Sequence, residues 1–252
     1  MHRLRGRLGD PERGTSLTEM LVSMVITGII IAAVASMTIT FAQSNARNIS
    51  RQDQVDTGRV VVETVSKKLR TAVMPSQLTS TCTLCTQDAF VLGKDFSVQF
   101  YANINNAGNS VGPSRVTYTL TTTGATAGTL VEKVQVPDSN TPTASGYVYC
   151  NAEIAGATAA CRARLTTRTL ATGVRWDTGV PIFAYYNGDG AAMLPATSGG
   201  SLTADQLSKV LSVELTVTVQ APTATRARAT TYIQRLTLPN AQAILRQSED
   251  TP

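Results

Sequence analysis

The pattern of apolar positions divides the chain into a helical part and a strand-rich part. The run from Met20 to Ala42 contains no charged residue. At about 1.5 Å per residue it would span roughly 34 Å as a helix, enough to cross a hydrocarbon core about 30 Å thick. In the next stretch, residues 45–74, apolar residues recur at helical spacing and charged residues occupy the other faces. These apolar positions are Val55, Val62, Val65, Leu69 and Val73. We therefore predict one continuous helix of about 55 residues that ends before Pro75.

Beyond Pro75 the pattern changes to short alternating runs separated by turn residues. Eight runs have strand character: AFVLG, FSVQFYA, SRVTYTLTT, GTLVEKVQV, RARLTTRTLA, PIFAYYN, VLSVELTVTVQ and TTYIQRLTL. Alternation is clearest where one face carries Val116, Tyr118 and Leu120, and again where one face carries Val213, Leu215, Val217 and Val219. Only TADQLSKVL suggests a further short helix.

These patterns predict an α+β fold, in which a long N-terminal helix packs on a mainly antiparallel β-sheet domain. The membrane-spanning first half of the helix would cover residues 15–44, and its amphipathic second half residues 45–74. The β-rich domain would follow at 75–240. Residues 241–252 have the composition of a flexible tail, and residues 1–14 precede the helix.

The segment FAYYNGDGAAM contains two Gly-containing pairs that could form a turn or part of a calcium loop. A calcium loop of the EF-hand type needs more acidic positions and a late glutamate, which are missing here. An Asn-Gly or Asp-Gly turn between two strands needs no further residues. We therefore predict a hairpin turn at Asn187–Gly190.

The residues before the apolar run are basic, with Arg3, Arg5, Arg7 and Arg13 against two carboxylates. A basic flank stays on the cytoplasmic side of a membrane helix. We therefore expect a single-pass protein of the cytoplasmic membrane, with a short cytoplasmic N-terminus and an extracytoplasmic domain. An uncleaved signal anchor would have the same flank. A cleaved secretory signal peptide fits less well, because the apolar run is too long and lacks a clean small-residue cleavage site.

Neither alternative explains Glu19, a carboxylate at the start of the apolar run. A charged side chain in a membrane helix costs about 2.5–3.5 kcal/mol near the bilayer centre, and such residues usually have a partner. Cleavage after Gly14 would create a positively charged amino terminus at Thr15, one helical turn from Glu19. In an assembly, Glu19 could neutralise the amino terminus of a neighbouring subunit. The alternative is a protonated Glu19 without a role.

The stretch RGTSLTEMLVSMVITGIIIAAV resembles the N-terminal signature of type IV pilins and of the pseudopilins of type II secretion. The resemblance implies cleavage after Gly14 by prepilin peptidase, N-methylation of Thr15, and assembly with other subunits into a pilus or secretion filament. Glu19 would act in assembly, and Gly28 would allow close approach of another helix. The chain departs from the family at Thr15, where mature subunits most often begin with Phe, and it lacks a helix-kinking proline.

A second, looser resemblance lies in the C-terminal half. The run FAYYNGDG, followed by a Leu-containing step and a strand of alternating Val and Leu, is similar to PilW-like minor pilins and J-type minor pseudopilins. This implies a minor subunit of the filament rather than its main component.

Four cysteines lie beyond the apolar run: Cys82, Cys85, Cys150 and Cys161. An even number of cysteines in an exported domain is typical of disulfides. Local pairs, Cys82 with Cys85 and Cys150 with Cys161, are the favoured arrangement. Crossed disulfides and a four-cysteine zinc site are the alternatives, although the wide Cys150–Cys161 spacing and an oxidising compartment disfavour zinc.

Composition argues against an enzyme. The only histidine is His2, and no G-x-S-x-G motif occurs, so triads and histidine bases have no residues to form them. We expect no catalytic residue, cofactor or metal ligand. The net charge of +5 is mild, and the basic runs at 67–70 and 226–229 are what a solvated surface also shows, so DNA contact is weakly supported. The alternative function is an anchored β domain that binds a ligand such as DNA or a surface glycan.

Overall fold

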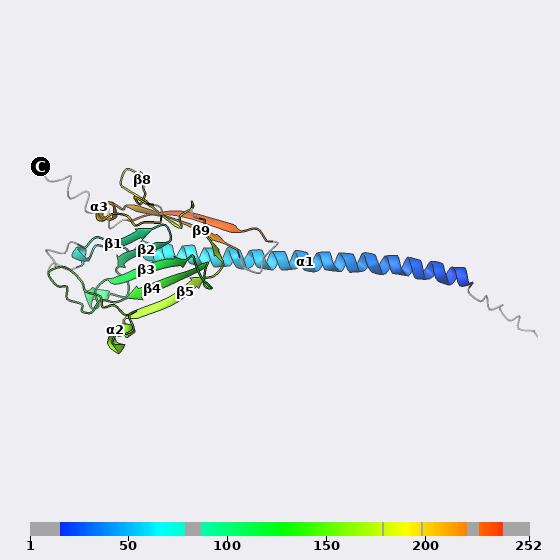
Figure 1. Ribbon diagram of the computed structural model, residues 1–252, viewed down its shortest axis with the longest axis horizontal. Coiled ribbons are helices and arrows are strands. Elements are labelled where there is room, and N and C mark those ends of the chain that lie inside the picture. Colours follow the sequence, from blue (N-terminus) through cyan, green and yellow to red (C-terminus); the bar gives the residue numbers. More distant parts are fainter. Residues whose placement is uncertain (1–15, 79–86, 178, 198, 221–226, 239–252) are drawn as a thin grey trace, which may run out of the picture. The chain divides into compact units, whose positions relative to one another are not determined.

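The computed structural model describes residues 16–78, 87–177, 179–197, 199–220 and 227–238. These residues form a long N-terminal helix and antiparallel β-sheets (Figure 1), which confirms the predicted α+β fold. The chain divides into a unit that ends at Asn48 and a second unit that begins at Ile49.

Helix α1, Leu17–Leu69, confirms the prediction of one continuous helix. Glu19 lies in its first turn and Lys67 and Lys68 lie in its last turn, where each charge is favourable to the helix dipole. The helix ends before Pro75 because the chain pairs with a strand instead. The amide of Val73 donates to Tyr101 O (2.9 Å), and the amide of Asn103 donates to Thr71 O (3.0 Å).

The buried face of α1 confirms the predicted apolar stripe at Val65 and Leu69, and it differs by one position from the predicted stripe nearer the N-terminus. The buried residues are Gln54, Gly58, Val61, Val65, Ser66 and Leu69. Val61 is fully buried, whereas Val55 and Val62 are only half-buried. The spacing of three and four residues is the expected helical one, but it passes through a glutamine and a glycine. A search for apolar residues alone therefore places the stripe slightly wrongly.

The first sheet is a five-stranded antiparallel meander in which each strand pairs with its sequence neighbours. Its strands are β1 Phe90–Lys94, β2 Ser97–Ala102, β3 Ser114–Thr121, β4 Thr129–Gln135 and β5 Leu165–Ala171. On β3 the residues Val116, Tyr118 and Leu120 are buried and their neighbours are not, as the alternation predicts. The sheet begins and ends with edge strands β1 and β5.

The remaining strands form a second antiparallel sheet, with the order β10-β9-β7-β8 and β6 paired to β9. They are β6 Val174–Arg175, β7 Phe183–Tyr186, β8 Ala192–Met193, β9 Ser212–Val219 and β10 Thr230–Thr237. All eight predicted strand runs contain a strand. The two-residue strands β6 and β8 and the division into two sheets were not predicted from the sequence, because pairing between distant segments leaves no local pattern.

Short helices and turns connect the strands. Helix α2, Ala159–Ala163, is capped by Thr158, and helix α3, Ala204–Ser208, by a capping box of Thr203 and Gln206. Two 3-10 turns are at Pro75–Gln77 and Ala107–Asn109. Helix α3 lies within the predicted TADQLSKVL segment. Asn187 Oδ1 accepts from the amides of Asp189 (3.1 Å) and Ala191 (2.8 Å), which confirms the predicted turn. The turn leads from β7 into β8.

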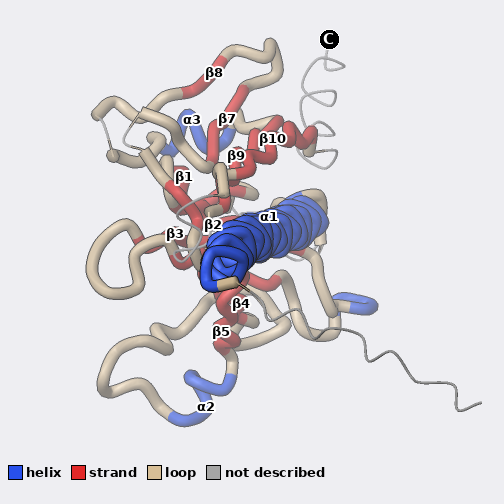
Figure 2. Tube along the Cα trace, turned by 90° about the vertical axis from the view of Figure 1, so that its right-hand side faces the viewer, coloured by secondary structure: helices blue, strands red, loops and turns tan. Residues whose placement is uncertain are grey.

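The second half of α1 lies between the two sheets. Strands β4 and β5 lie on one side of it, and β9 and β10 on the other (Figures 1 and 2). Ser66 Oγ donates to Gln234 Oε1 on β10 at 2.8 Å, and Tyr185 Oη on β7 donates to Lys94 O on β1 at 3.1 Å. The core is continuous through both sheets. It includes Phe100, Tyr118, Leu130, Phe183, Val213 and Leu215.

Candidate functional site

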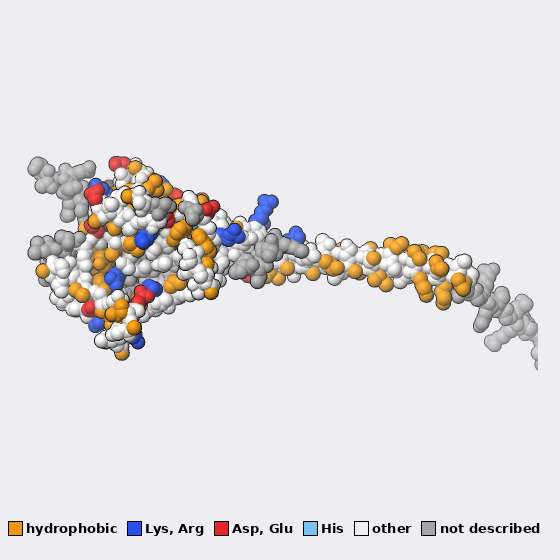
Figure 3. All heavy atoms as spheres, in the orientation of Figure 1, with side chains coloured by type: hydrophobic (Ala, Val, Ile, Leu, Met, Phe, Trp, Pro, Cys, Tyr) orange, Lys and Arg blue, Asp and Glu red, His pale blue; other side chains and the backbone are white. Residues whose placement is uncertain are grey.

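The first half of α1 is apolar and exposed in the part of the chain that the structure describes. Every residue from Ser16 to Asn48 is exposed, including Ile29 at 65%, Ile31 at 63% and Met37 at 77%. Figure 3 shows apolar side chains along this stretch. A window with a mean hydropathy of 2.4 makes α1 long and apolar enough to cross a membrane, as predicted. So much contiguous apolar surface requires lipid or protein around it.

Glu19 is the acidic residue of the first helical turn. Its amide donates to Ser16 O (3.0 Å) and to Ser16 Oγ (3.3 Å), and its carbonyl accepts from Ser23 Oγ (2.8 Å). The backbone of the residue is thus fixed, whereas its carboxylate is exposed and makes no ion pair with the part of the chain that the structure describes. Gly14 and Thr15, the predicted processing site, lie outside the described residues.

Gly28, the second predicted assembly residue, lies on the opposite side of the helix from Glu19. With 3.6 residues per turn, the two positions are about two and a half turns apart. A Cβ atom at Gly28 would meet nothing within 4 Å, so the chain itself does not require glycine there. The structure therefore does not bring the two residues together on one contact surface. Partners of Glu19 and Gly28 would have to approach α1 from different sides.

The structure describes one of the two predicted disulfides. Cys150 and Cys161 are bonded, with 6.0 Å between their Cα atoms. Cys161 lies in α2 and is buried, and Gln135 on β4 donates to Cys150 O at 2.5 Å. This pairing contradicts the crossed arrangement and the four-cysteine zinc site, because both need these two sulfurs elsewhere. Cys82 and Cys85 lie outside the described residues.

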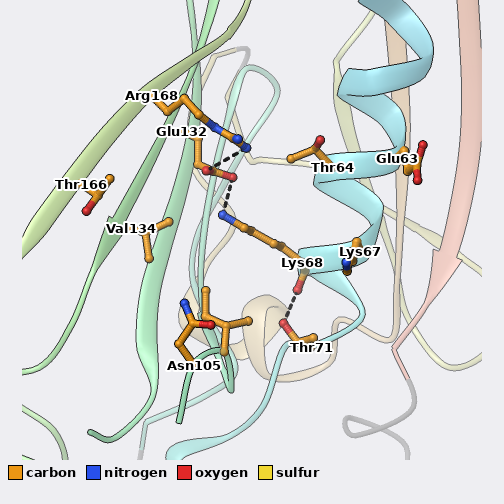
Figure 4. A pocket seen from close by; sticks show the side chains of 11 residues that line it. Glu63, Thr64, Lys67, Lys68, Thr71, Asn105, Glu132, Val134, Thr166 and Arg168 are labelled. Atoms are coloured by element: carbon orange, nitrogen blue, oxygen red, sulfur yellow. Dashed lines mark hydrogen bonds and ion pairs between the residues drawn. The ribbon is translucent and has the colours of Figure 1, made fainter.

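A groove of about 670 Å³ lies between α1 and the strands β4 and β5. Figure 4 shows Lys68 extending from α1 and Arg168 from β5 toward Glu132 on β4. The helix wall also carries Glu63, Thr64 and Lys67. The charged floor of this groove was not predicted.

Glu132 is a buried carboxylate, with 5% of its side chain exposed. Its Oε1 lies 2.8 Å from Lys68 Nζ and accepts from Tyr118 Oη at 2.8 Å, and its Oε2 lies 3.3 Å from Arg168 Nη2. Burial, and secondly the negative charge of Glu132, raise the pKa of the Tyr118 hydroxyl. The hydroxyl therefore stays protonated and donates. One hydrogen bond and two ion pairs compensate for the desolvation of the carboxylate.

Sequence reasoning read the basic run 67–70 as a solvated surface. That reading is wrong for Lys68, which is largely buried against Glu132, and it fits Lys67 and Arg70, which are exposed. One sequence signal, the position of Glu132 within its strand, could have predicted the cluster of Glu132, Lys68 and Arg168. Glu132 occupies the same face of its strand as buried Leu130, and a charge on the inward face of a strand needs a partner.

A buried carboxylate with ion pairs from two other segments, as at Glu132, holds secondary-structure elements together. The Glu132 carboxylate pairs with two cations, Lys68 and Arg168, and these contacts join α1, β4 and β5. The described residues thus offer two features for function: the exposed apolar half of α1 with Glu19, and the groove beside β5. No protein-family model matches the chain, and no curated protein matches it.

Proposed function

We propose that the chain is a structural subunit, of the minor kind, in a filament of the type IV pilin and pseudopilin class. Prepilin peptidase would cleave it after Gly14 and methylate Thr15, and its N-terminal helix would then leave the membrane for the filament. One observation carries the proposal. The first half of α1 is exposed and apolar on every side, and a single carboxylate, Glu19, stands at its beginning.

Two environments could cover such a helix. Lipid alone accounts for the apolar side chains but penalises Glu19. A bundle of subunit helices accounts for both, because the amino terminus of a neighbouring subunit offers a positive charge to Glu19, whose carboxylate has no ion pair among the described residues. The pairing also fixes the register of insertion, since a subunit in another register would leave the carboxylate unpaired.

The opposite placement of Glu19 and Gly28 supports a helix with neighbours on more than one side. A helix that is apolar all round is normally surrounded. Glu19 would face the amino terminus of one subunit, and Gly28 would admit the backbone of another at close range. Both contacts are met in a multi-helix core, whereas a helix that serves only as a lipid anchor needs neither.

The disulfide supports an extracytoplasmic position of the domain. Cys150–Cys161 belongs to an oxidising compartment, because disulfides are rare in the cytosol. This agrees with the basic flank before the apolar run, which favours a cytoplasmic N-terminus. The domain would first face the outside of the cytoplasmic membrane and later the surface of the filament.

The decisive experiment measures the N-terminal mass of the protein from membranes of cells with and without prepilin peptidase. We expect a chain that begins at a methylated Thr15, found only when the peptidase is present. A chain that still begins at Met1 in both strains would reject the filament class. It would leave the alternative of an anchored β domain that binds a ligand such as DNA or a surface glycan.

Assembly is tested with Glu19→Gln, which removes the charge and keeps the shape. We expect normal membrane insertion and reduced recovery in sheared filaments. Glu63→Gln, on the second half of the same helix, is the matched control and should assemble normally. Equal recovery of both variants would show that Glu19 has no part in assembly, and an anchored receptor would remain with the membranes in every case.

A further inference from the structure

The two edge strands of the first sheet, β1 and β5, differ in whether another segment covers them. At the β1 edge, Gly93 O accepts from the amide of Leu202 at 2.8 Å, and Leu202 and Leu207 pack closely over Gly93. This edge is therefore capped. Strand β5, at the other edge, pairs only with β4, and no strand or capping segment adjoins its outer side within the residues that the structure describes.

The pairing of β5 with β4 shows which backbone N–H and C=O groups of β5 point outward at its free edge. The amide of Val136 donates to Arg164 O at 3.1 Å, which makes this pair a hydrogen-bonded one. Hydrogen-bonded and non-bonded pairs alternate along an antiparallel ladder. Thr166, opposite Val134, and Arg168, opposite Glu132, thus bond to β4. The N–H and C=O groups of Leu165, Thr167 and Thr169 point outward.

The sequence of β5 does little to block this edge from Leu165 to Thr169, and the pairing with β4 shifts register only beyond Thr169, between Leu130 and Val131. Natural sheets protect edges with proline, very short strands or bulges. The strand LTTRTLA has no proline and is rich in threonine, a residue that favours strands. Thr166 to Thr169 are all exposed. The only charge of the strand, Arg168, turns toward Glu132 rather than outward (Figure 4).

The groove beside the edge has uncompensated positive charge. Its lining includes the cations Lys67, Lys68 and Arg168 against the carboxylates Glu63 and Glu132. Arg168 is 55% exposed and uses only Nη2 on Glu132. Its other N–H groups have no acceptor, and Lys67 has no ion pair, among the described residues. A strand added to β5 would place alternate side chains on this face of the sheet.

We propose that the free edge of β5 accepts an extended segment of a partner protein as a sixth strand, with an acidic side chain opposite Arg168. Residues in a non-hydrogen-bonded pair lie only about 4.5 Å apart at Cα. The acidic group would therefore reach the open side of the guanidinium, which binds carboxylates in a bidentate manner. The backbone supplies the affinity and Arg168 the selectivity. This inference goes beyond the proposed filament role and does not depend on it.

The test uses the full chain in detergent micelles and two probe peptides, acetyl-TVTETVT-amide and acetyl-TVTKTVT-amide. Hydrogen exchange and titration calorimetry report binding. We expect the glutamate peptide to slow exchange at the amides of Thr167 and Thr169, and the lysine peptide to bind about tenfold more weakly. Equal binding of both peptides, or unchanged exchange at these two amides, would overturn the proposal.

Two variants distinguish the contribution of backbone hydrogen bonds at the β5 edge from the contribution of the Arg168 charge. Thr167→Pro removes an outward N–H but no bond to β4, so it should abolish binding, whereas the matched Thr167→Ala should bind normally. Arg168→Gln should bind both peptides alike. Undiminished binding by Thr167→Pro would reject strand addition. If that variant does not fold, the Arg168→Gln result decides, and a retained preference for glutamate would reject the assigned role of Arg168.

Discussion

The ring of Tyr232 on β10 lies directly against the backbone of Gly58 on α1. A Cβ atom at Gly58 would come within 2.5 Å of Tyr232 Cε2, and Tyr232 Oη donates to Val55 O at 3.0 Å. The last described strand is thereby fixed to the helix by shape and by this hydrogen bond, in addition to the one between Ser66 and Gln234. Only a residue without a side chain permits this approach.

We therefore expect Gly58→Ala to lower the free energy of unfolding by about 1–3 kcal/mol. At a solvent-exposed helix position, glycine to alanine would raise the free energy of unfolding by about 0.5–1 kcal/mol. A decrease at Gly58 would therefore indicate the contact with Tyr232. Urea unfolding of the full chain in detergent measures the effect. The double variant Gly58→Ala, Tyr232→Leu should lose less than the sum of the single variants. A single variant as stable as the parent chain would show that the ring can move at no cost.

The Glu132 cluster should contribute more to stability than an exposed ion pair. Glu132→Gln leaves Lys68 without its partner and weakens the bond from buried Tyr118, so we expect a loss of about 1–3 kcal/mol. Lys68 and Arg168 can turn toward solvent, which keeps the loss below that of a fully buried pair. Glu153→Gln, which removes a surface pair with Lys133, should change stability by less than about 1 kcal/mol. Equal effects in denaturant titrations would contradict this ranking.

Stability should fall at alkaline pH. Burial raises the pKa of Tyr118, Tyr149 and Tyr185 in the folded chain. Above the unfolded tyrosine pKa of about 10, the unfolded chain holds fewer protons than the folded one, so the free energy of unfolding falls as pH rises. Below pH 10 these groups have no such effect. Denaturant titrations between pH 8 and 12 should show the decline, and Tyr118→Phe should make it shallower. An identical slope in that variant would exclude Tyr118 as a contributor.

Loss of the disulfide should destabilise the region around α2. Replacing both Cys150 and Cys161 by alanine should lower the free energy of unfolding by about 2–4 kcal/mol, because the unfolded chain gains freedom. Urea unfolding measures the total, and hydrogen exchange should show the largest increase at α2 and the preceding loop. Thr158→Ala, which removes the helix cap, is the local control and should cost about 1 kcal/mol. An unchanged midpoint in the double variant would show that the bond does not constrain the chain.

Much of the fold was predictable, because its signals are local. The length of α1 follows from apolar spacing, and the buried faces of β3 and β9 follow from strict alternation at Val116, Tyr118, Val213 and Leu215. The hairpin turn at Asn187 follows from side-chain chemistry within the turn. Each of these features depends on residues a few positions apart, so one stretch of sequence contains the whole cause.

The features of the structure that the sequence did not predict depend on contacts between distant segments. The helix turns Gln54 and Gly58 inward because β10 supplies Tyr232. Lys68 is only partly exposed because β4 places Glu132 beside it. The division of the strands into two sheets likewise depends on which edges meet around α1. None of these partners is near in sequence, so no local pattern could indicate them.

The sequence by itself determined the exposed apolar half of α1, its single carboxylate at Glu19 and the strand content of the domain, since hydrophobicity and alternation act locally. The tertiary structure decided three other things: which face of α1 is buried, which carboxylate neutralises Lys68, and which strand edge stays open. Burial and pairing are properties of the whole packed domain. A charge such as Arg168 takes its role from the residues that folding brings beside it.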